Sequence, residues 1–306
     1  MEFYSYVGGS NYALTISNSD VKANSAALGG DGIQIELGGG YAGTATVNVQ
    51  NCSFDDNKSQ PVQATALGSS TLDITIDGNT VAKTSQGNEG FIVSNGANGR
   101  ASVRMTNNTV TGIGGVAFYV GQVAGNASAS SNLTAIISGN TVSHPASATN
   151  SAIIAFLTST VGQVAPANIL IDGNNVTENS TSGVARGIFV DTPDNNTTPS
   201  FTATITNNTV SVTDPVAGLQ GIGAQARRGT GCFDIRSNTV TYPAGTPSGV
   251  FGVRLRQASP GAANLEQGAS AGTPAAVLAA NNLSATTEVL GTVTVVANNV
   301  CLVPPS

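Results

Sequence analysis

The amino-acid sequence predicts an all-β solenoid, in which one chain winds into about nine stacked coils. Three observations predict it: a short phrase that recurs about every 30 residues, apolar residues that alternate within each copy, and a composition poor in charge. Of the 306 residues, 40% are hydrophobic, only 9% are charged, and 37 are glycine. A chain of this length and composition can bury a sizeable core, and it is too apolar for a disordered protein.

The recurring phrase has the form I-x-x-N-x-V, as in "VRMTNNTVT" and "ATITNNTVS". Weaker copies place Ser19 and Cys52 in the Asn slot. The steps between slots are regular up to the sixth Asn, and the last two steps are irregular, as a terminal cap would be. The Asn slots are Asn79, Asn108, Asn140, Asn174, Asn208, Asn238, Asn281 and Asn298.

Within each copy the apolar residues alternate, which is typical of a strand with one buried face. Gly or Asn usually precedes the slot, and both tolerate a positive φ, so the chain should bend there before a second strand opens. A further apolar phrase, such as "GFIVS" or "VAFYV", lies midway in most periods. The predicted inward residues include Ile74, Ile76, Val103, Met105, Ile137, Ile171, Ile205 and Ile235.

Copies of one phrase lie a full period apart, so like strands should pair in parallel and in register. Each strand then covers the open edge of the strand before it. The slot asparagines fall above one another, where their amides can form a hydrogen-bonded ladder. We therefore predict one domain over residues 1–306, with regular coils over 1–241 and irregular C-terminal coils and a cap over 242–306.

On these repeats the chain resembles the right-handed parallel β-helix superfamily, whose repeats read I-x-x-N-x-I followed by G-I. That superfamily includes pectate lyases and other polysaccharide-acting enzymes, phage tailspikes and the passenger regions of bacterial adhesins. The resemblance covers roughly residues 10–300 and implies a right-handed, single-stranded parallel β-helix. The stretch from "VRLRQASPGAANLEQ" to "VCLVPPS" is similar to the end of repeat domains in large bacterial surface proteins. The resemblance says little about activity, because function depends on sites grafted on the fold.

The most prominent charged residues lie near the C-terminal end. Asp234 and Arg236 alternate on one predicted strand, and Arg254 and Arg256 alternate on another. Two arginines on one strand face could bind a carboxylate or an acidic sugar. They could equally pair with Asp234 or Glu266 to cap the rod, and we favour this capping role.

Other candidates for chemistry are weak. Asp191 and Asp194 in "VDTPDNN" could hold a cation, but the segment is more typical of an ordinary turn. His144 is interpreted as a loop residue, since no Ser or Cys partner has a recognisable spacing. No nucleotide, zinc or serine-hydrolase motif is present. The sequence therefore assigns no catalytic residue, no metal and no cofactor.

Several aromatic residues fall in the midway phrases: Phe118, Tyr119, Phe156 and Phe189. If the alternation turns some of them outward, they form an exposed strip suited to sugar rings or to a protein partner. The alternative is that all but Tyr119 face the core. Tyr119 and Phe189 are retained as candidate ligand-binding residues.

The three cysteines allow one disulfide. Cys52 occupies an inward slot and is expected to be a buried thiol. Cys232 and Cys301 both lie in the irregular terminal region, and the resemblance to surface repeat domains also places a cysteine at each point. We predict that they are joined, with two independent thiols as the alternative. A disulfide indicates an oxidising compartment.

These features favour a non-enzymatic extracellular module of a larger bacterial surface protein, either a structural stalk or an adhesin-type binder of a glycan or another surface protein. A polysaccharide lyase or glycoside hydrolase is the alternative. The net charge of -6 argues against nucleic-acid binding, and no apolar run is long enough for membrane insertion. The first residues do not form a signal peptide, and the first strand begins almost at once, which favours a piece of a longer secreted chain with flanking domains.

Overall fold

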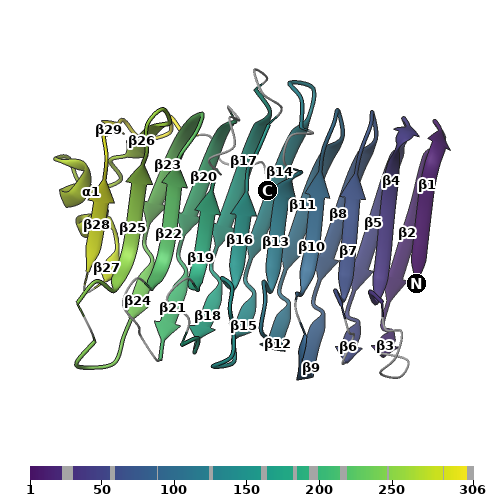
Figure 1. Ribbon diagram of the computed structural model, residues 1–306, viewed down its shortest axis with the longest axis horizontal. Coiled ribbons are helices and arrows are strands. Elements are labelled where there is room, and N and C mark those ends of the chain that lie inside the picture. The colour runs from purple at the N-terminus through teal and green to yellow at the C-terminus, as the bar shows by residue number, and fades with distance from the viewer. Residues whose placement is uncertain are drawn as a thin grey trace.

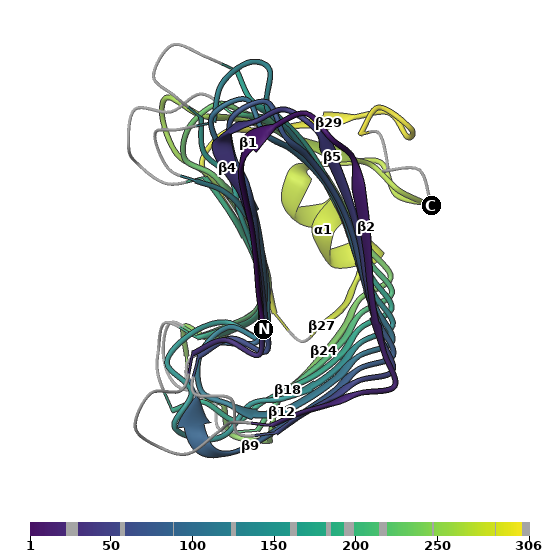
Figure 2. The same cartoon turned by 90° about the vertical axis from the view of Figure 1, so that its right-hand side faces the viewer.

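The computed structural model describes residues 1–22, 30–55, 59–87, 89–123, 127–159, 164–181, 185–192, 199–213, 219–246, 248–284 and 286–301. The chain forms a parallel β-helix whose coils stack along the long axis of the molecule (Figure 1). Seen from the N-terminal end, each coil runs clockwise as the chain recedes from the viewer, so the helix is right-handed (Figure 2). The predicted all-β parallel β-helix is confirmed.

Three parallel sheets make the three sides of the helix. Sheet 1 holds β1 (Glu2–Gly8), β4 (Ile33–Tyr41), β7 (Val62–Ala66), β10 (Phe91–Asn95), β13 (Phe118–Gln122), β16 (Ile153–Phe156), β19 (Arg186–Asp191), β22 (Gln220–Ala226), β25 (Phe251–Gln257) and β28 (Thr287–Leu290). Sheet 2 holds β2 (Tyr12–Ser17), β5 (Thr44–Gln50), β8 (Thr71–Asp77), β11 (Arg100–Thr106), β14 (Asn132–Ser138), β17 (Pro166–Asp172), β20 (Ser200–Thr206), β23 (Thr230–Arg236), β26 (Ala262–Glu266) and β29 (Val293–Val296). Sheet 3 holds β3 (Asp20–Lys22), β6 (Ser53–Asp55), β9 (Thr80–Gly87), β12 (Thr109–Ile113), β15 (Thr141–Ser143), β18 (Asn175–Glu178), β21 (Thr209–Val212), β24 (Thr239–Thr241) and β27 (Leu283–Ser284).

Like phrases pair with like phrases, in parallel and in register. Met105 on β11, for example, lies between Ile76 on β8 and Ile137 on β14. All eight residues predicted to face inward are buried, with at most 2% of their surface exposed. They join one continuous hydrophobic core that runs along the helix. Repetition of one phrase thus builds both the sheet and the interior that it covers.

The bend between sheets 2 and 3 uses the predicted Gly or Asn. Gly139 has a φ of 64° and Asn107 has a φ of 56°, both in the left-handed region. Most residues with a Cβ are disfavoured there, which explains why Gly or Asn precedes five of the six ladder asparagines; Ser237, with a φ of 58°, is the exception. The bend turns the next side chain, the slot Asn, back into the helix.

The slot asparagines form a ladder of buried amides. In each coil the backbone N and the side-chain Nδ2 both donate to the Oδ1 of the Asn one coil further on, at 2.9 to 3.1 Å. Nδ2 also donates to a backbone carbonyl of the coil before, as from Asn140 to Met105 at 2.9 Å. These amides are at most 1% exposed, and every polar atom has a partner. The ladder includes Asn79, Asn108, Asn140, Asn174, Asn208 and Asn238.

The last two predicted slots are wrong. Asn238 donates to the amide oxygen of Asn282, not to that of Asn281, whose Nδ2 donates to the Gln267 carbonyl. Asn298 is exposed and its Nδ2 donates to the Gly268 carbonyl at 2.8 Å. The ladder therefore ends at Asn282, because a helix replaces the expected strand and shifts the slot by one residue.

That helix, α1 (Pro274–Asn281), was not expected from the sequence, in which no helical period appears. Thr273 caps its N-terminus by accepting from the backbone N of Ala276, and proline occupies its first turn. Val277 and Leu278 are buried in the core. In Figure 2 the helix lies across the C-terminal opening of the ring of sheets. Sheets 1 and 2 continue past residue 241 through β25, β26, β28 and β29.

Cys232 and Cys301 form a disulfide, as predicted, with a Cα–Cα distance of 5.3 Å. It holds the C-terminal segment against the outer surface of sheet 2 (Figure 2). Cys52 is a buried free thiol, also as predicted, and its Sγ lies 3.6 Å from the Ile16 carbonyl.

Candidate ligand-binding face on sheet 1

The outer face of sheet 1 carries a row of side chains that changes in character along the stack. One residue from each strand stands in register, so each lies about 4.8 Å from the next. The row starts apolar, passes through a glycine and ends charged. From β10 to β28 it consists of Ile92, Tyr119, Ile154, Phe189, Gly223, Arg254 and Glu288.

The apolar part of this row is a second hydrophobic cluster outside the main core. It contains Val116, Ile154 and Phe189, with Tyr119 and Phe156 packed against them. Phe189 is 9% exposed, and burial raises the pKa of Tyr119 to about 12. The alternation turns Tyr119, Phe156 and Phe189 outward, as one of the two alternatives expected, but the strip is only partly exposed, because Phe189 is buried and Tyr119 and Phe156 are half-buried. Phe118 faces the core.

An arginine covers the last aromatic ring of the cluster. The guanidinium carbon of Arg186 lies 3.8 Å from the centre of the Phe189 ring, a cation–π contact. Its Nε donates to the buried Gln220 at 3.2 Å. Gly223 makes room for this arrangement, because a Cβ there would lie 2.4 Å from Gln220 Oε1 and 3.1 Å from Arg186 Cδ. The missing side chain leaves a place where Arg186 can lie along the sheet.

Arg186 shares its surroundings with two further arginines. Burial lowers its pKa; Asp191 opposes that shift, and Arg254 and Arg227 add to it. Asp191 is 2% exposed and forms an ion pair with Arg227, whose Nε lies 3.1 Å from Oδ1. Gln225 donates to the same oxygen at 2.6 Å. Asp191 therefore neutralises part of an arginine cluster, and Asp194, its suggested partner in cation binding, lies outside the described residues.

Arg254 and Arg256 complete this cluster on β25. Arg254 Nε lies 2.6 Å from Glu288 Oε2, and its guanidinium carbon lies 4.9 Å from the centre of the Phe251 ring. Arg256 is exposed and stands in register with Gln225. We call Arg186, Arg227, Arg254 and Arg256 the arginine cluster. Within the described part of the chain its four cations face two carboxylates, Asp191 and Glu288, so these residues carry an excess of positive charge in a chain of net charge -6.

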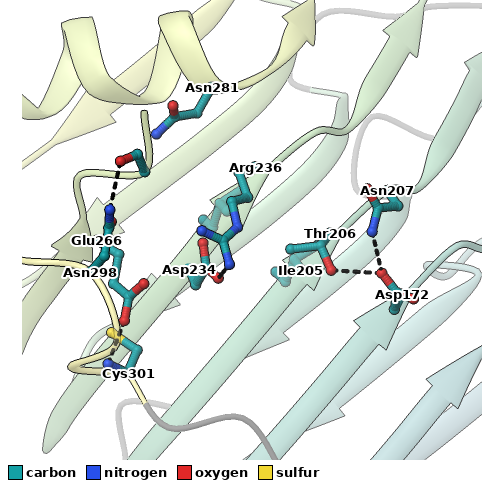
Figure 3. A network of polar contacts seen from close by, with 12 residues as sticks. Asp172, Ile205, Thr206, Asn207, Asp234, Arg236, Glu266, Asn281, Asn298 and Cys301 are labelled. Atoms are coloured by element: carbon teal, nitrogen blue, oxygen red, sulfur yellow. Dashed lines mark hydrogen bonds and ion pairs between the residues drawn. The ribbon is translucent and has the colours of Figure 1, made fainter. Parts of the chain in front are cut away.

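Asp234 and Arg236 are not part of this face. They lie on β23 in sheet 2, where Arg236 pairs with Asp234 at 3.0 Å (Figure 3). Neither Asp234 nor Glu266 is the partner of Arg254, so the predicted capping pair is wrong. Alternation along a strand shows which residues share a face, but it does not show to which of three sheets the strand belongs.

Asp234 points outward and yet is only 2% exposed. Its neighbour Glu266 accepts at Oε1 from the Cys301 backbone N at 2.6 Å, next to the Cys232–Cys301 disulfide (Figure 3). This burial raises the pKa of Asp234 to about 6; Arg236 acts against the shift and Glu266 adds to it. Two neighbouring buried carboxylates are therefore part of the C-terminal closure.

The acids of the repeat phrase itself form hydrogen bonds between neighbouring coils. Asp172 Oδ1 accepts from Thr206 Oγ1 and from Asn207 Nδ2 one coil further on, both at 2.7 Å (Figure 3). Asp77 makes the equivalent bonds to the coil that follows it. These outward acids join neighbouring coils, and no second acid is stacked on them.

Sequence reasoning missed the partner of His144. His144 Nδ1 lies 2.9 Å from Glu178 Oε2, and both side chains are fully buried. Each residue follows an inward valine by two positions, so both point into the helix one coil apart. Glu178 Oε1 also accepts from the backbone N of Ser180 at 3.0 Å. The spacing of 34 residues, one coil, was the available signal, and the pair fixes the corner between sheets 3 and 1.

No protein-family model matches this chain, and searches of curated proteins and of solved structures found no significantly similar protein. The residues that the structure describes contain no group of three or more His, Cys, Asp or Glu side chains placed to hold a metal ion. Within the same residues, no helix is long and apolar enough to cross a membrane.

Proposed function

We propose that this protein is a non-enzymatic, extracellular β-helical module of a larger bacterial surface protein, and that it binds glycans with acidic groups. The observation that carries the proposal is the arginine cluster, which gathers four of the 11 Lys and Arg residues of an acidic chain on one face. The residues are contributed by consecutive coils, so the repeat of the fold sets their spacing.

The arginine cluster suits an elongated anion. A guanidinium binds a carboxylate or sulfate through two parallel N–H groups, and it keeps its charge at any physiological pH. Arg186 on β19 and Arg254 on β25 are two strand steps apart, about 10 Å along the stack. A sugar chain lying parallel to the helix axis would meet one arginine and then the next. In Figure 2 the connections at both ends of sheet 1 reach outward past this face.

The extracellular assignment rests on the disulfide. Structural disulfides persist in oxidising compartments, and this one closes a loop of 69 residues. Ten strands at about 4.8 Å would make a rod about 45 Å long, a shape that suits a stalk as well as a binder. A partner protein with an acidic surface would use the same arginines, so the test must include glycans as isolated ligands.

A glycan array with acidic and neutral members tests the proposal. We expect binding to sulfated or uronate-containing glycans that weakens as salt rises, because screening reduces charge contacts. The Arg254→Ala/Arg256→Ala variant should lose about tenfold in affinity. Arg104→Ala, on the outer face of sheet 2, is the matched control and should change nothing. Equal binding by both variants, or binding to neutral glycans alone, would contradict the proposal.

The alternative is a polysaccharide lyase or glycoside hydrolase. The observation in its favour is Asp234, whose pKa of about 6 is in the range used by general acids and bases. Its ion pair with Arg236 and its place beside Glu266, which accepts from Cys301, argue for a structural role. We expect no release of unsaturated or reducing sugars from acidic or neutral polysaccharides. Release that Arg254→Ala or Asp234→Asn abolishes would establish the enzyme instead.

A further inference from the structure

A pocket of about 590 Å³ opens at the corner between sheets 3 and 1, near the C-terminal end of the stack. The connection between β24 and β25 forms most of its wall, and Thr286 of the following coil closes one side. Figure 1 shows this region at the end of the stack, beside β28. The pocket borders the arginine cluster, because Arg254 lies over the ring of Phe251, which lines the pocket. Nothing in the proposed function requires the pocket.

The pocket exists because two consecutive coils turn this corner with connections of different length. Nine residues, 242–250, join β24 to β25, whereas only two residues join β27 to β28. In the coil before, seven residues join β21 to β22. A connection of two residues has too little chain to match the one of nine residues before it, and the pocket lies at this mismatch.

The pocket has apolar walls and a polar rim. Tyr242, Pro243 and Phe251 supply apolar and aromatic surface, while Thr246 and Thr286 supply hydroxyls. Thr246 donates its proton to the Pro243 carbonyl at 2.7 Å, and Thr286 donates to the Val250 carbonyl at 3.1 Å. Thr286 Oγ1 also accepts from the Gly252 backbone N at 3.0 Å, so the Thr246 hydroxyl is the one that offers a ligand mainly acceptor lone pairs. Among the described residues that line the pocket, none carries a charge.

Tyr242 is built into this site. Burial raises its pKa to about 12, while side-chain hydrogen bonds to Thr286 and Ser284 act against the shift. Gly252 allows the ring to occupy its position, because a Cβ there would lie 2.8 Å from the Tyr242 hydroxyl and 1.6 Å from Ser284 Oγ. The absence of a side chain at residue 252 thus preforms one wall.

We propose that this pocket binds an uncharged sugar ring, such as a neutral pyranose. Aromatic side chains take the apolar C–H face of such a ring, and its hydroxyls donate to the acceptor oxygens on the rim. A charged ligand would lose hydration without gaining a partner here. A purely apolar ligand would leave the rim hydroxyls without the donors that they can accept.

Saturation-transfer NMR on the full chain tests the inference with methyl β-glucopyranoside and methyl β-galactopyranoside as probes, and with p-cresol as an apolar ring of similar size. We expect transfer to at least one glycoside. Ser248→Trp, at the exposed rim, should fill the mouth and reduce this transfer about tenfold. Ser147→Trp is the matched control, since Ser147 is an exposed residue at the same corner three coils earlier.

Each outcome of this experiment either supports or overturns the sugar site. Transfer to a glycoside that Ser248→Trp removes and Ser147→Trp retains supports the sugar site. Transfer to p-cresol alone, transfer to neither class, or equal loss in both variants overturns it. Arg256→Ala should keep glycoside transfer while weakening binding of acidic glycans, so failure of this site and failure of the arginine cluster are distinguishable.

Discussion

The middle coils and the C-terminal end of this protein satisfy their strand edges, core and buried polar groups in different ways. In the middle, the neighbour of each residue is its own counterpart one coil away, so one phrase satisfies strand edges, core and buried amides together. At the C-terminal end, β28 and β29 are the last strands of sheets 1 and 2 among the described residues. There the chain uses devices that occur once: α1, the Cys232–Cys301 disulfide and the buried acids Asp234 and Glu266.

This difference teaches where the molecule has freedom to acquire function. A substitution in the middle affects both neighbouring coils, because each strand pairs with one strand on either side. Near the C-terminal end, consecutive coils have connections of different length. This difference leaves surface features that identical coils would not have. The pocket beside Tyr242 results from such a mismatch, and the arginine cluster also lies toward this end (β19 to β25).

The largest loss of stability is expected from removing the disulfide at the C-terminal end. In the chain-entropy account, the disulfide restricts a loop of 69 residues in the unfolded state, which corresponds to about 4 kcal/mol. Cys232→Ser/Cys301→Ser should lower the free energy of unfolding by that amount in urea titrations, and reductant should have no further effect on the variant. Thiol titration of the denatured, unreduced wild type should find one free thiol. Three free thiols would contradict both the bridge and the extracellular assignment.

The second-largest loss of stability is expected in the middle coils, from a substitution in the asparagine ladder. Asn140→Leu removes an acceptor for two donors of Asn108 and the donors to Asn174 and Met105, all in a buried site. We expect a loss of about 3 kcal/mol in unfolding free energy, because orphaned buried polar groups are costly.

Asn298→Leu is the control for this prediction, since Asn298 makes one exposed bond. It should change stability by less than about 0.5 kcal/mol. If the two substitutions had equal effects, the ladder would not be the source of stability in the middle coils.

The smallest effect concerns pH and the buried acids. The pKa of Asp234 is about 6 in the folded protein, above its ordinary value of 3.8, so the folded state binds a proton that the unfolded state releases between these values. Its contribution to stability is therefore present below about pH 4 and is lost as pH rises through 6, by about 2 kcal/mol. Asp234→Asn cannot titrate and should lack this decline.

Comparison of the two unfolding free energies from pH 4 to pH 7 isolates this residue from the other titrating groups. The wild type should lose stability relative to Asp234→Asn as pH rises. A difference that stays constant with pH would show that the carboxyl is solvated in the folded protein.

Much of the middle region was predictable from the sequence. Alternation identified inward residues such as Met105, and the I-x-x-N-x-V phrase predicted parallel pairing and the amide ladder up to Asn238. These predictions succeed because they concern relations that repeat: if one coil places Asn at a corner, the next coil must place its own Asn above it. The superfamily resemblance implied the handedness, and it contributed to the pairing of Cys232 with Cys301.

The sequence by itself therefore determined the strand pattern, the register and the composition of the core. Only the tertiary structure decided which outer faces come together and what covers them. Local alternation places Asp234 and Arg254 outward, but their separation on different sheets depends on the path of a whole coil. It also places Phe189 outward, while the ring is buried because Arg186 lies over it. The pairing of His144 with Glu178 and the slot at Asn282 likewise depend on contacts between coils, which no short window of sequence contains.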